Sequence, residues 1–282
     1  MKWAALILMT IDHLALYFTG VWPNELVVVC RLLGRLAFPV FAYQLSLGYS
    51  RTQSLPKYIL RTAAFATAGQ AVMELVASHT GAFVFRNVLF TFTFSLLVLL
   101  GFDLMTKSIS DMVATMRPAT NTTNDSRATP PGYGVKINVK GISLPSRVGF
   151  IAGLILLVIG FTAVILINSD YTYYGVLTVL LFHIVNEHTD PLSHNSSDES
   201  VRKFISFMFR VYLLLNVVYL VINVVLFGRS LNFYLMQCFS VFAVTLFPLE
   251  RKARKPGKIS KYFFYVYYPA HLVLIMWLST IL

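Results

Sequence analysis

Long apolar runs, broken at short intervals by turn residues and basic residues, decide what this chain can fold into. A helix that spans a membrane needs about 20 predominantly apolar residues. With 57% hydrophobic and only 12% charged residues, the chain cannot cover a soluble surface. We therefore predict an all-α, polytopic membrane protein. Its expected transmembrane helices, about nine, lie near 3–20, 26–49, 57–77, 86–105, 147–168, 171–188, 203–226, 231–248 and 262–282.

Basic residues are distributed unevenly between the two ends of these spans. Lys and Arg number 23 against 12 Asp and Glu, for a net charge of +11. Because cytoplasmic loops are enriched in Lys and Arg, the side that holds more of them is predicted to be cytoplasmic. Alternating spans place 18 of the 23 on the side of the N-terminus, at Lys2, 51–61, 107–147, 202–203 and 251–261. We therefore predict a cytoplasmic N-terminus and an external C-terminus.

The excess positive charge also bears on partners. Since most of it reports orientation, no nucleic-acid partner is expected. The basic run at 251–258 is suited to acidic lipids at the cytoplasmic face, and a phosphate-bearing cosubstrate is the alternative.

A polar segment divides the predicted bundle. Residues 106–146 are rich in Ser, Thr, Asn, Pro and Gly, and we expect a flexible cytoplasmic loop there. It separates a four-helix N-terminal half, 1–105, from a five-helix C-terminal half, 147–282. We find no internal repeat, which weighs against the transporter folds built from duplicated halves.

Ionisable residues inside spans are the candidates for function, because they are costly at membrane depth. Asp12 and His13 interrupt the first span. His13 lies about 16 Å along a helix that begins at the inner surface, hence near mid-membrane. Neighbouring residues point about 100° apart on a helix, so we expect Asp12 to take an Arg or amide partner and His13 to face a cavity. An imidazole is suited to proton abstraction near neutral pH.

Arg31 and Arg35 share one helical face near the external end of the second span. They need an anionic partner, for which Asp12 or Glu74 is available. A structural ion pair and a substrate-facing role both stay open at this point.

Two further pairs repeat this spacing, and one more histidine lies inside a span. Gln70 and Glu74 share a face of the third span, and His183 and Glu187 have the same spacing near the inner end of the sixth. His271 follows Pro269 by two residues in the last span. A proline there bends the helix and frees a carbonyl group, which often happens beside a cavity.

Other chemistries lack their motifs in this sequence. Cys30 and Cys238 lie in apolar runs without ligand spacing, so no metal site is expected. There is no Walker-type glycine loop, no HExxH and no GxSxG, which makes ATP hydrolysis, zinc hydrolysis and serine-esterase chemistry poor candidates.

Several blocks resemble the TraX family, which is named for the acetylation of F-type conjugative pilin. The parts IDH, GRLAFPVFA and FFYVYYPAHL are the most specific, while 106–146 and 189–202 lie outside the resemblance. The blocks are KWAALILMTIDHLALYF (2–18), RLLGRLAFPVFAYQLSLGYSRT (31–52), NVLFTF (87–92), YTYYGVLTVLLFH (171–183) and KYFFYVYYPAHLVLI (261–275).

The resemblance carries chemical expectations. The TraX family is similar to the membrane acyltransferase superfamily of envelope O-acetylases, in which a basic residue precedes a first-helix histidine by ten intervening residues. Lys2 and His13 have that spacing. This implies acetyl-CoA as a cosubstrate from the cytoplasm, His13 as the catalytic histidine, Lys2 near the donor phosphates, and a bacterial inner membrane. The acceptor stays open between a pilin N-terminus or other peptide amine, an envelope glycan and a lipid.

We thus expect an acetyltransferase with His13 as general base and no metal. A covalent acetyl-histidine relay is the alternative route. The rival functions are a proton-coupled transporter or flippase, and a non-enzymatic pilus or envelope assembly factor. The catalytic candidates are His13, Asp12, Glu74 and His271. The candidates for binding the donor or its oxyanion are Lys2, Arg31, Arg35 and Asn87.

Overall fold

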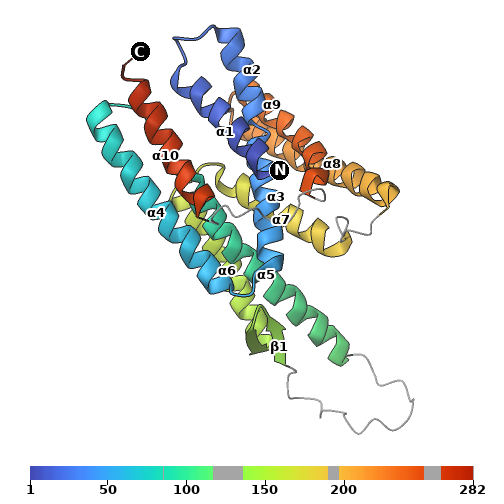
Figure 1. Ribbon diagram of the computed structural model, residues 1–282. Helices are drawn as coiled ribbons and strands as arrows, with labels where there is room; N and C mark the ends of the chain where they lie inside the picture. Colours follow the sequence, from blue (N-terminus) through green and yellow to red (C-terminus); the bar gives the residue numbers. More distant parts are fainter. Residues whose placement is uncertain (85, 117–135, 190–196, 251–261, 282) are drawn as a thin grey trace, which may run out of the picture.

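The computed structural model describes residues 1–84, 86–116, 136–189, 197–250 and 262–281, which form a helical bundle with one β-hairpin (Figure 1). The first half holds α1 (Lys2–Tyr17), α2 (Asn24–Gly34), α3 (Ala37–Arg51), α4 (Leu55–Thr80) and α5 (Val88–Met116).

The second half begins with the hairpin and ends beside the first. It holds β1 (Lys136–Val139), β2 (Ile142–Pro145), α6 (Ser146–Leu166), α7 (Thr172–Thr189), α8 (Asp198–Val221), η1 (Ile222–Leu226), α9 (Leu231–Cys238), η2 (Phe239–Glu250) and α10 (Phe263–Leu278). Strands β1 and β2 pair in antiparallel register, with Lys136 opposite Pro145.

Helix ends follow local sequence signals. α4 has Pro56 in its first turn, where the missing N–H costs nothing, and ends at Gly81 with a φ of 70°. The Ser197 hydroxyl accepts the Ser200 N–H and so caps α8, whose first turn also carries Asp198. Between its ends, Lys2 and Tyr17, α1 is a continuous apolar helix apart from Thr10, Asp12 and His13.

Within the described ranges, five helical segments are long and apolar enough to cross a membrane. A shorter apolar helix, Phe263–Leu278, coincides with the last predicted span. The all-α class is confirmed, whereas the nine-span path and the orientation of both termini stay predictions. The five segments are Asn24–Arg51, Val88–Thr115, Ser146–Leu166, Asp198–Leu226 and Leu231–Glu250.

The distribution of polar and apolar side chains is the reverse of that in a soluble protein. Charged or amide side chains such as Asp12, Arg35 and Gln237 are buried, while α6 exposes Ile151 and Val158 to more than half of their full area. An apolar outer surface around a polar interior is what a lipid environment requires.

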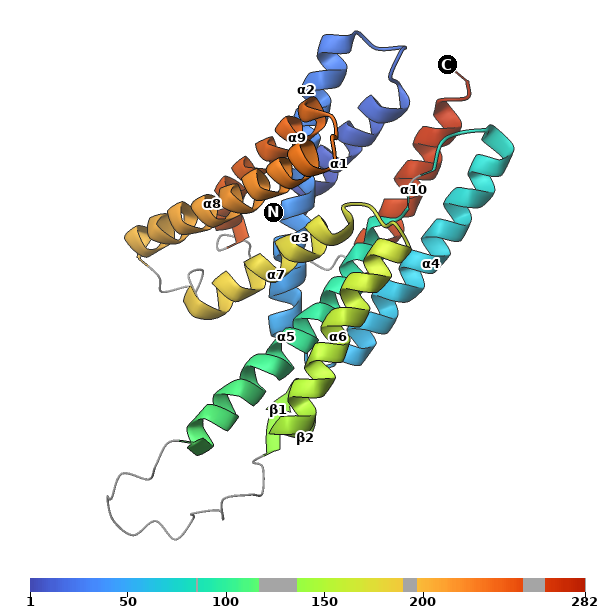
Figure 2. The ribbon, with the colours of Figure 1, turned by 180° about the vertical axis from the view of Figure 1, so that it is seen from behind.

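Glycine residues allow α5 and α6 to pack closely. A Cβ on Gly101 of α5 would approach the Gly153 carbonyl oxygen of α6 to 2.7 Å, and the reverse substitution would be as tight. Close approach through glycine is typical of helix pairs in membranes. The α5–α6 pair extends beyond the other helices and ends at the hairpin (Figure 2).

The expected flexible loop at 106–146 is wrong for part of its length. α5 continues to Met116, and 136–145 form the hairpin, whose Ile137 and Val139 are buried. Residues 117–135 lie outside the described residues. Apolar positions alternating in KINV provide the hydrophobic face that orders the hairpin.

The first and last helices, α1 and α10, pack against each other and so position the site. α10 lies beside α4 in both views of the ribbon and also packs on α1 (Figures 1 and 2). α1 in turn packs on α2 and α3. Polar residues of the first and last helices therefore meet inside the bundle.

Candidate functional site

Asp12 of α1 is held between two arginines of the α2–α3 segment. Arg31 Nη1 donates to Asp12 Oδ2 at 2.8 Å, and Arg35 Nη2 lies 3.4 Å from both carboxylate oxygens. The expected Asp12–Arg pairing is confirmed, and both arginines use Asp12 rather than Glu74.

Glycine makes this approach possible. A Cβ on Gly34, between the two arginines in sequence, would collide with the side chain of Asp12. A helix position without a side chain is therefore needed where the carboxylate crosses.

His13 faces His271 of α10 in the interior. His13 Nδ1 and His271 Nε2 are 2.8 Å apart, and His271 Nδ1 lies 2.8 Å from the Tyr267 carbonyl oxygen. A carbonyl oxygen only accepts, so His271 Nδ1 carries the proton and its neutral Nε2 accepts from His13 Nδ1–H. This order of donors leaves the lone pair of neutral His13 on Nε2, as a general base requires.

A cavity of about 260 Å³ lies over these groups, which we call the histidine cavity. Its wall includes His13, Asp12 and both arginines, so the prediction that His13 faces a cavity is confirmed. Asp170 and Tyr171, from the α6–α7 connection, and Tyr268 of α10 complete its polar lining.

A second cavity, of about 670 Å³, adjoins the first. We call it the cation cavity, because Lys2, Arg51 and Arg61 line it together with an apolar wall. The Lys2 ammonium lies 5.3 Å from the ring centre of Phe264, and the Arg61 guanidinium lies over Tyr58 and Tyr265. The two cavities share five lining residues: Met9, Phe41, Val88, Phe92 and Tyr268.

Arg35 is also tied to the far side of the bundle. Its Nη1 lies 3.4 Å from Gln237 Oε1, and Gln237 Nε2 donates to the Tyr174 hydroxyl at 3.2 Å. Tyr174 continues to Tyr212 at 2.8 Å and to Asn216 at 3.0 Å. This buried hydrogen-bond network holds Arg35 Nη1, while Asp12 holds Arg35 Nη2.

Two predicted site residues lie elsewhere. The Glu74 side chain is 53% exposed and pairs with Arg86 at 2.8 Å, while Gln70 also donates to it. Asn87 is fully buried, but its Oδ1 accepts the Leu89 N–H at the start of α5 and its Nδ2 donates to Ala66. Neither residue lines the described cavities.

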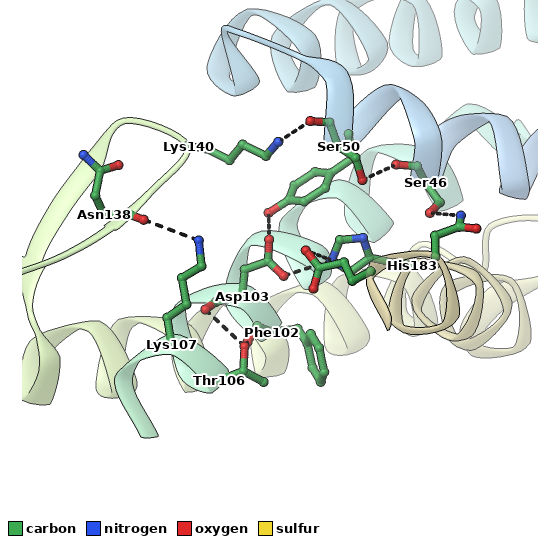
Figure 3. A network of polar contacts seen from close by, with 12 residues as sticks. Ser46, Ser50, Phe102, Asp103, Thr106, Lys107, Asn138, Lys140 and His183 are labelled. Atoms are coloured by element: carbon green, nitrogen blue, oxygen red, sulfur yellow. Dashed lines mark hydrogen bonds and ion pairs between the residues drawn. The ribbon is translucent and has the colours of Figure 1, made fainter. Parts of the chain in front are cut away.

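A separate cluster occupies the other end of α7, and we call it the Asp103 cluster. His183 Nε2 is 2.9 Å from Asp103 Oδ1 and 3.7 Å from Glu187 Oε1. Tyr49 donates its hydroxyl to the second Asp103 oxygen at 2.8 Å. Figure 3 shows Asp103 and His183 side by side, with Lys140 of the hairpin reaching Ser50 at the end of α3.

Lys140 joins the hairpin electrostatically to this cluster. Its ammonium lies 4.9 Å from the Tyr49 ring centre and donates to the Ser50 carbonyl at 2.8 Å. Burial lowers the pKa of Lys140, although the negative charges of Asp103 and Glu187 act in the opposite direction.

Several lining residues were not predicted from the sequence. In the sequence, Arg51 and Arg61 contribute only to the charge distribution that predicts orientation, and Asp170 lies between two predicted spans. Tyr171 and Tyr268 lie in the blocks that carry the family resemblance, which was the available signal for them. The basic run at 251–258 lies outside the described residues.

Comparison with known protein families matches residues 1–279 to the TraX family, described as TraX protein. No curated protein and no solved structure matches the sequence. The match covers every helix described above.

Proposed function

The chain belongs to the TraX family, and we propose that it is an integral membrane acyltransferase of the bacterial inner membrane. It moves an acetyl group from cytoplasmic acetyl-CoA to an amine or hydroxyl acceptor presented from the membrane or the outer side. A pilin N-terminus, an envelope glycan and a lipid are the acceptor classes.

The joined cavities carry this proposal. A large cavity with three cations adjoins a smaller one with a histidine, and the two share five wall residues. Lys2 and His13, on one helix, are separated by about 16 Å along its axis. A donor with an anionic head and a thioester at the end of a long arm needs such a two-part site.

The cation cavity is suited to the donor head. Lys2, Arg51 and Arg61 lie at the ends of α1, α3 and α4 that the charge distribution predicts to be cytoplasmic. Cations bind phosphates through charge-assisted hydrogen bonds. Phe264 and Tyr265, also in this wall, offer aromatic faces to an adenine base or the arm.

His13 then removes the acceptor proton. Its Nε2 lone pair takes the proton from the acceptor O–H or N–H as that atom attacks the thioester carbonyl carbon. The C–S bond breaks, the acetyl group stays on the acceptor, and His13 returns the proton to the thiolate. His271 keeps His13 in the required tautomer.

The two arginines stabilise charge on the carbonyl oxygen. Arg31 and Arg35 both line the histidine cavity, and Asp12 fixes their positions without leaving them as buried, unpaired cations. Asn87, the other candidate for binding the oxyanion, has no part in this step, because its side-chain amide bonds to Ala66 and to the Leu89 N–H.

The test is acetyl transfer in proteoliposomes. Full-length protein is supplied with radiolabelled acetyl-CoA and envelope extract, and both labelled product and CoA release are measured. We expect His13→Ala to reduce transfer by about 10²- to 10⁴-fold, with donor binding retained. His79→Ala, at an exposed position on α4, is the matched control and should be unaffected.

Mass spectrometry of envelope fractions with and without the protein then identifies the acceptor. Wild-type transfer by His13→Ala would refute the assignment of the base. Absence of acetyl-CoA binding by the wild type would refute the enzyme and favour a transporter or an assembly factor.

A further inference from the structure

We propose that Asp103, His183 and Glu187 bind one divalent transition-metal ion, of the Zn²⁺ or Mn²⁺ type, at the end of the bundle near the hairpin. The site is independent of the acyl-transfer site. It joins α5, which supplies Asp103, to α7, which supplies the other two ligands.

The donor atoms have the right chemistry and nearly the right spacing. One imidazole nitrogen and two carboxylate oxygens lie within 4.8 Å of one another. Two ligands about 2.1 Å from one ion lie about 3.0 Å apart at a right angle and about 3.4 Å apart at a tetrahedral angle. The distances from His183 Nε2, 2.9 Å to Asp103 and 3.7 Å to Glu187, bracket these values.

A second group already orients one ligand. The Tyr49 hydroxyl donates to Asp103 Oδ2 and leaves Oδ1 directed at His183. Metal-binding carboxylates are typically held by hydrogen bonds of this kind. The Asp103 and His183 side chains are 6% and 0% exposed, so both ligands are fixed by packing (Figure 3).

Two buried polar atoms without hydrogen-bond partners among the described residues provide the independent observation. Without an ion, Nε2 between two carboxylates carries the proton, and buried Nδ1 is then an acceptor with no donor among the described residues. Asn186 Oδ1, one helical turn further on, is a second buried acceptor without a donor in that part of the chain. The buried polar groups at this end of α7 therefore lack a complete set of hydrogen bonds among the described residues, and coordination of an ion by Nε2 would add a bond that these residues alone do not supply.

Access and charge are consistent with a bound cation. The Glu187 side chain is 47% exposed and opens the cluster to solvent, where water can complete the coordination. The two carboxylates supply two negative charges, which a divalent ion balances. Lys140 supplies one positive charge nearby and thus competes with the ion without displacing the ligands.

The experiment measures metal binding by the full-length protein, purified in detergent with an affinity tag that contains no histidine. After treatment with EDTA, the protein is dialysed against Zn²⁺ or Mn²⁺, with Mg²⁺ as the comparison, and bound metal is quantified. We expect one Zn²⁺ or Mn²⁺ per chain. The midpoint of thermal unfolding should rise by about 5 °C at a 100-fold excess over the dissociation constant.

Variants separate this site from adventitious binding. His183→Gln should abolish binding, and Glu187→Gln, at a half-exposed position that leaves packing intact, should weaken it at least tenfold. Glu199→Gln and His79→Gln remove an exposed carboxylate and an exposed imidazole elsewhere, and both should bind as the wild type does. Equal binding by wild type and Glu187→Gln, or no stoichiometric binding by the wild type, would overturn the proposal.

Discussion

Three buried histidines form two groups that differ in what surrounds them: His13 with His271, and His183 in the Asp103 cluster. His13 is bonded to another histidine and lies in the wall of a cavity, beside two arginines whose charge is balanced by Asp12. His183 is bonded to a carboxylate, and neither described cavity reaches it. A neutral partner leaves the first imidazole available as a base, whereas a carboxylate partner holds the second in place.

The buried aspartates of the two groups, Asp12 and Asp103, also differ in the partners that they stabilise. Asp12 stabilises two guanidinium groups that cannot lose their charge, while Asp103 is bonded to an imidazole and a hydroxyl group. Removing Asp12 leaves two charges without a counter-ion, whereas removing Asp103 leaves two buried hydrogen-bonding groups without their partner. The two clusters should therefore respond unequally to the same substitution.

The largest expected effect is on stability and comes from Asp12→Ala. Loss of a buried counter-ion costs about 3–5 kcal/mol, because Arg31 and Arg35 stay charged inside the bundle. Asp103→Ala should cost about 1–3 kcal/mol, the price of an unmatched buried hydrogen-bond group. Denaturation of both variants in detergent measures the difference, with Glu74→Ala, at an exposed carboxylate, as the control. Equal losses for the two aspartates would remove the distinction between the clusters.

A second effect is on activity and comes from His271. His271→Ala removes the acceptor of His13 Nδ1–H, so the tautomer of His13 is no longer fixed. We expect acetyl transfer to fall by about 10- to 100-fold, the usual cost of losing an orienting partner.

His271→Gln keeps a side-chain oxygen that can accept this bond and should recover part of the rate. His183→Gln, in the other cluster, should leave transfer within about threefold of wild type. If His271→Gln recovered none of the transfer rate and His183→Gln lost most of it, the two histidines would not have separate roles.

The sequence predicted the helical class, the position of most helices and the Asp12–Arg pairing, because each depends on local periodicity or on a charge that needs a partner. It could not predict that Asn87 caps α5, since an Asn before a helix and an Asn in a cavity look alike in sequence. The exposure of Glu74 could not be predicted either, because helical spacing does not show which face meets solvent.

The Asp103 cluster shows the other limit. His183 and Glu187 were recognisable as an i, i+4 pair, but Asp103 comes from a helix 80 residues earlier. Only the packing of α5 against α7 brings them together. Likewise, the ordered hairpin inside 106–146 depends on Ile137 and Val139 finding a buried surface, which composition alone does not reveal.

A third, smaller effect tests whether the cation cavity binds the donor. Arg61→Met keeps the aliphatic stem over Tyr58 and Tyr265 but removes a phosphate-binding charge. We expect KM for acetyl-CoA to rise about tenfold, or about 1.4 kcal/mol, with kcat nearly unchanged. Lys57→Met, an exposed cation on the same helix outside the cavity, is the matched control. An equal rise in both variants would mean that general surface charge, not the cation cavity, attracts the donor.

The smallest expected effect concerns Lys140, which contacts Tyr49 of the Asp103 cluster and the neighbouring Ser50 carbonyl. Lys140→Gln removes a half-exposed charge near two carboxylates, and such charges are worth at most about 1 kcal/mol in solvent. Because the ammonium competes with a cation for the same negative charge, its removal should tighten Zn²⁺ or Mn²⁺ binding by about two- to fivefold. Acetyl transfer should not change, since Lys140 lines neither cavity. Lys136→Gln, exposed on the same hairpin, controls for net charge. Tighter metal binding by Lys140→Gln would show that electrostatic competition dominates. Weaker binding would contradict this prediction and show that Lys140 mainly supports the cluster through its contact with Ser50.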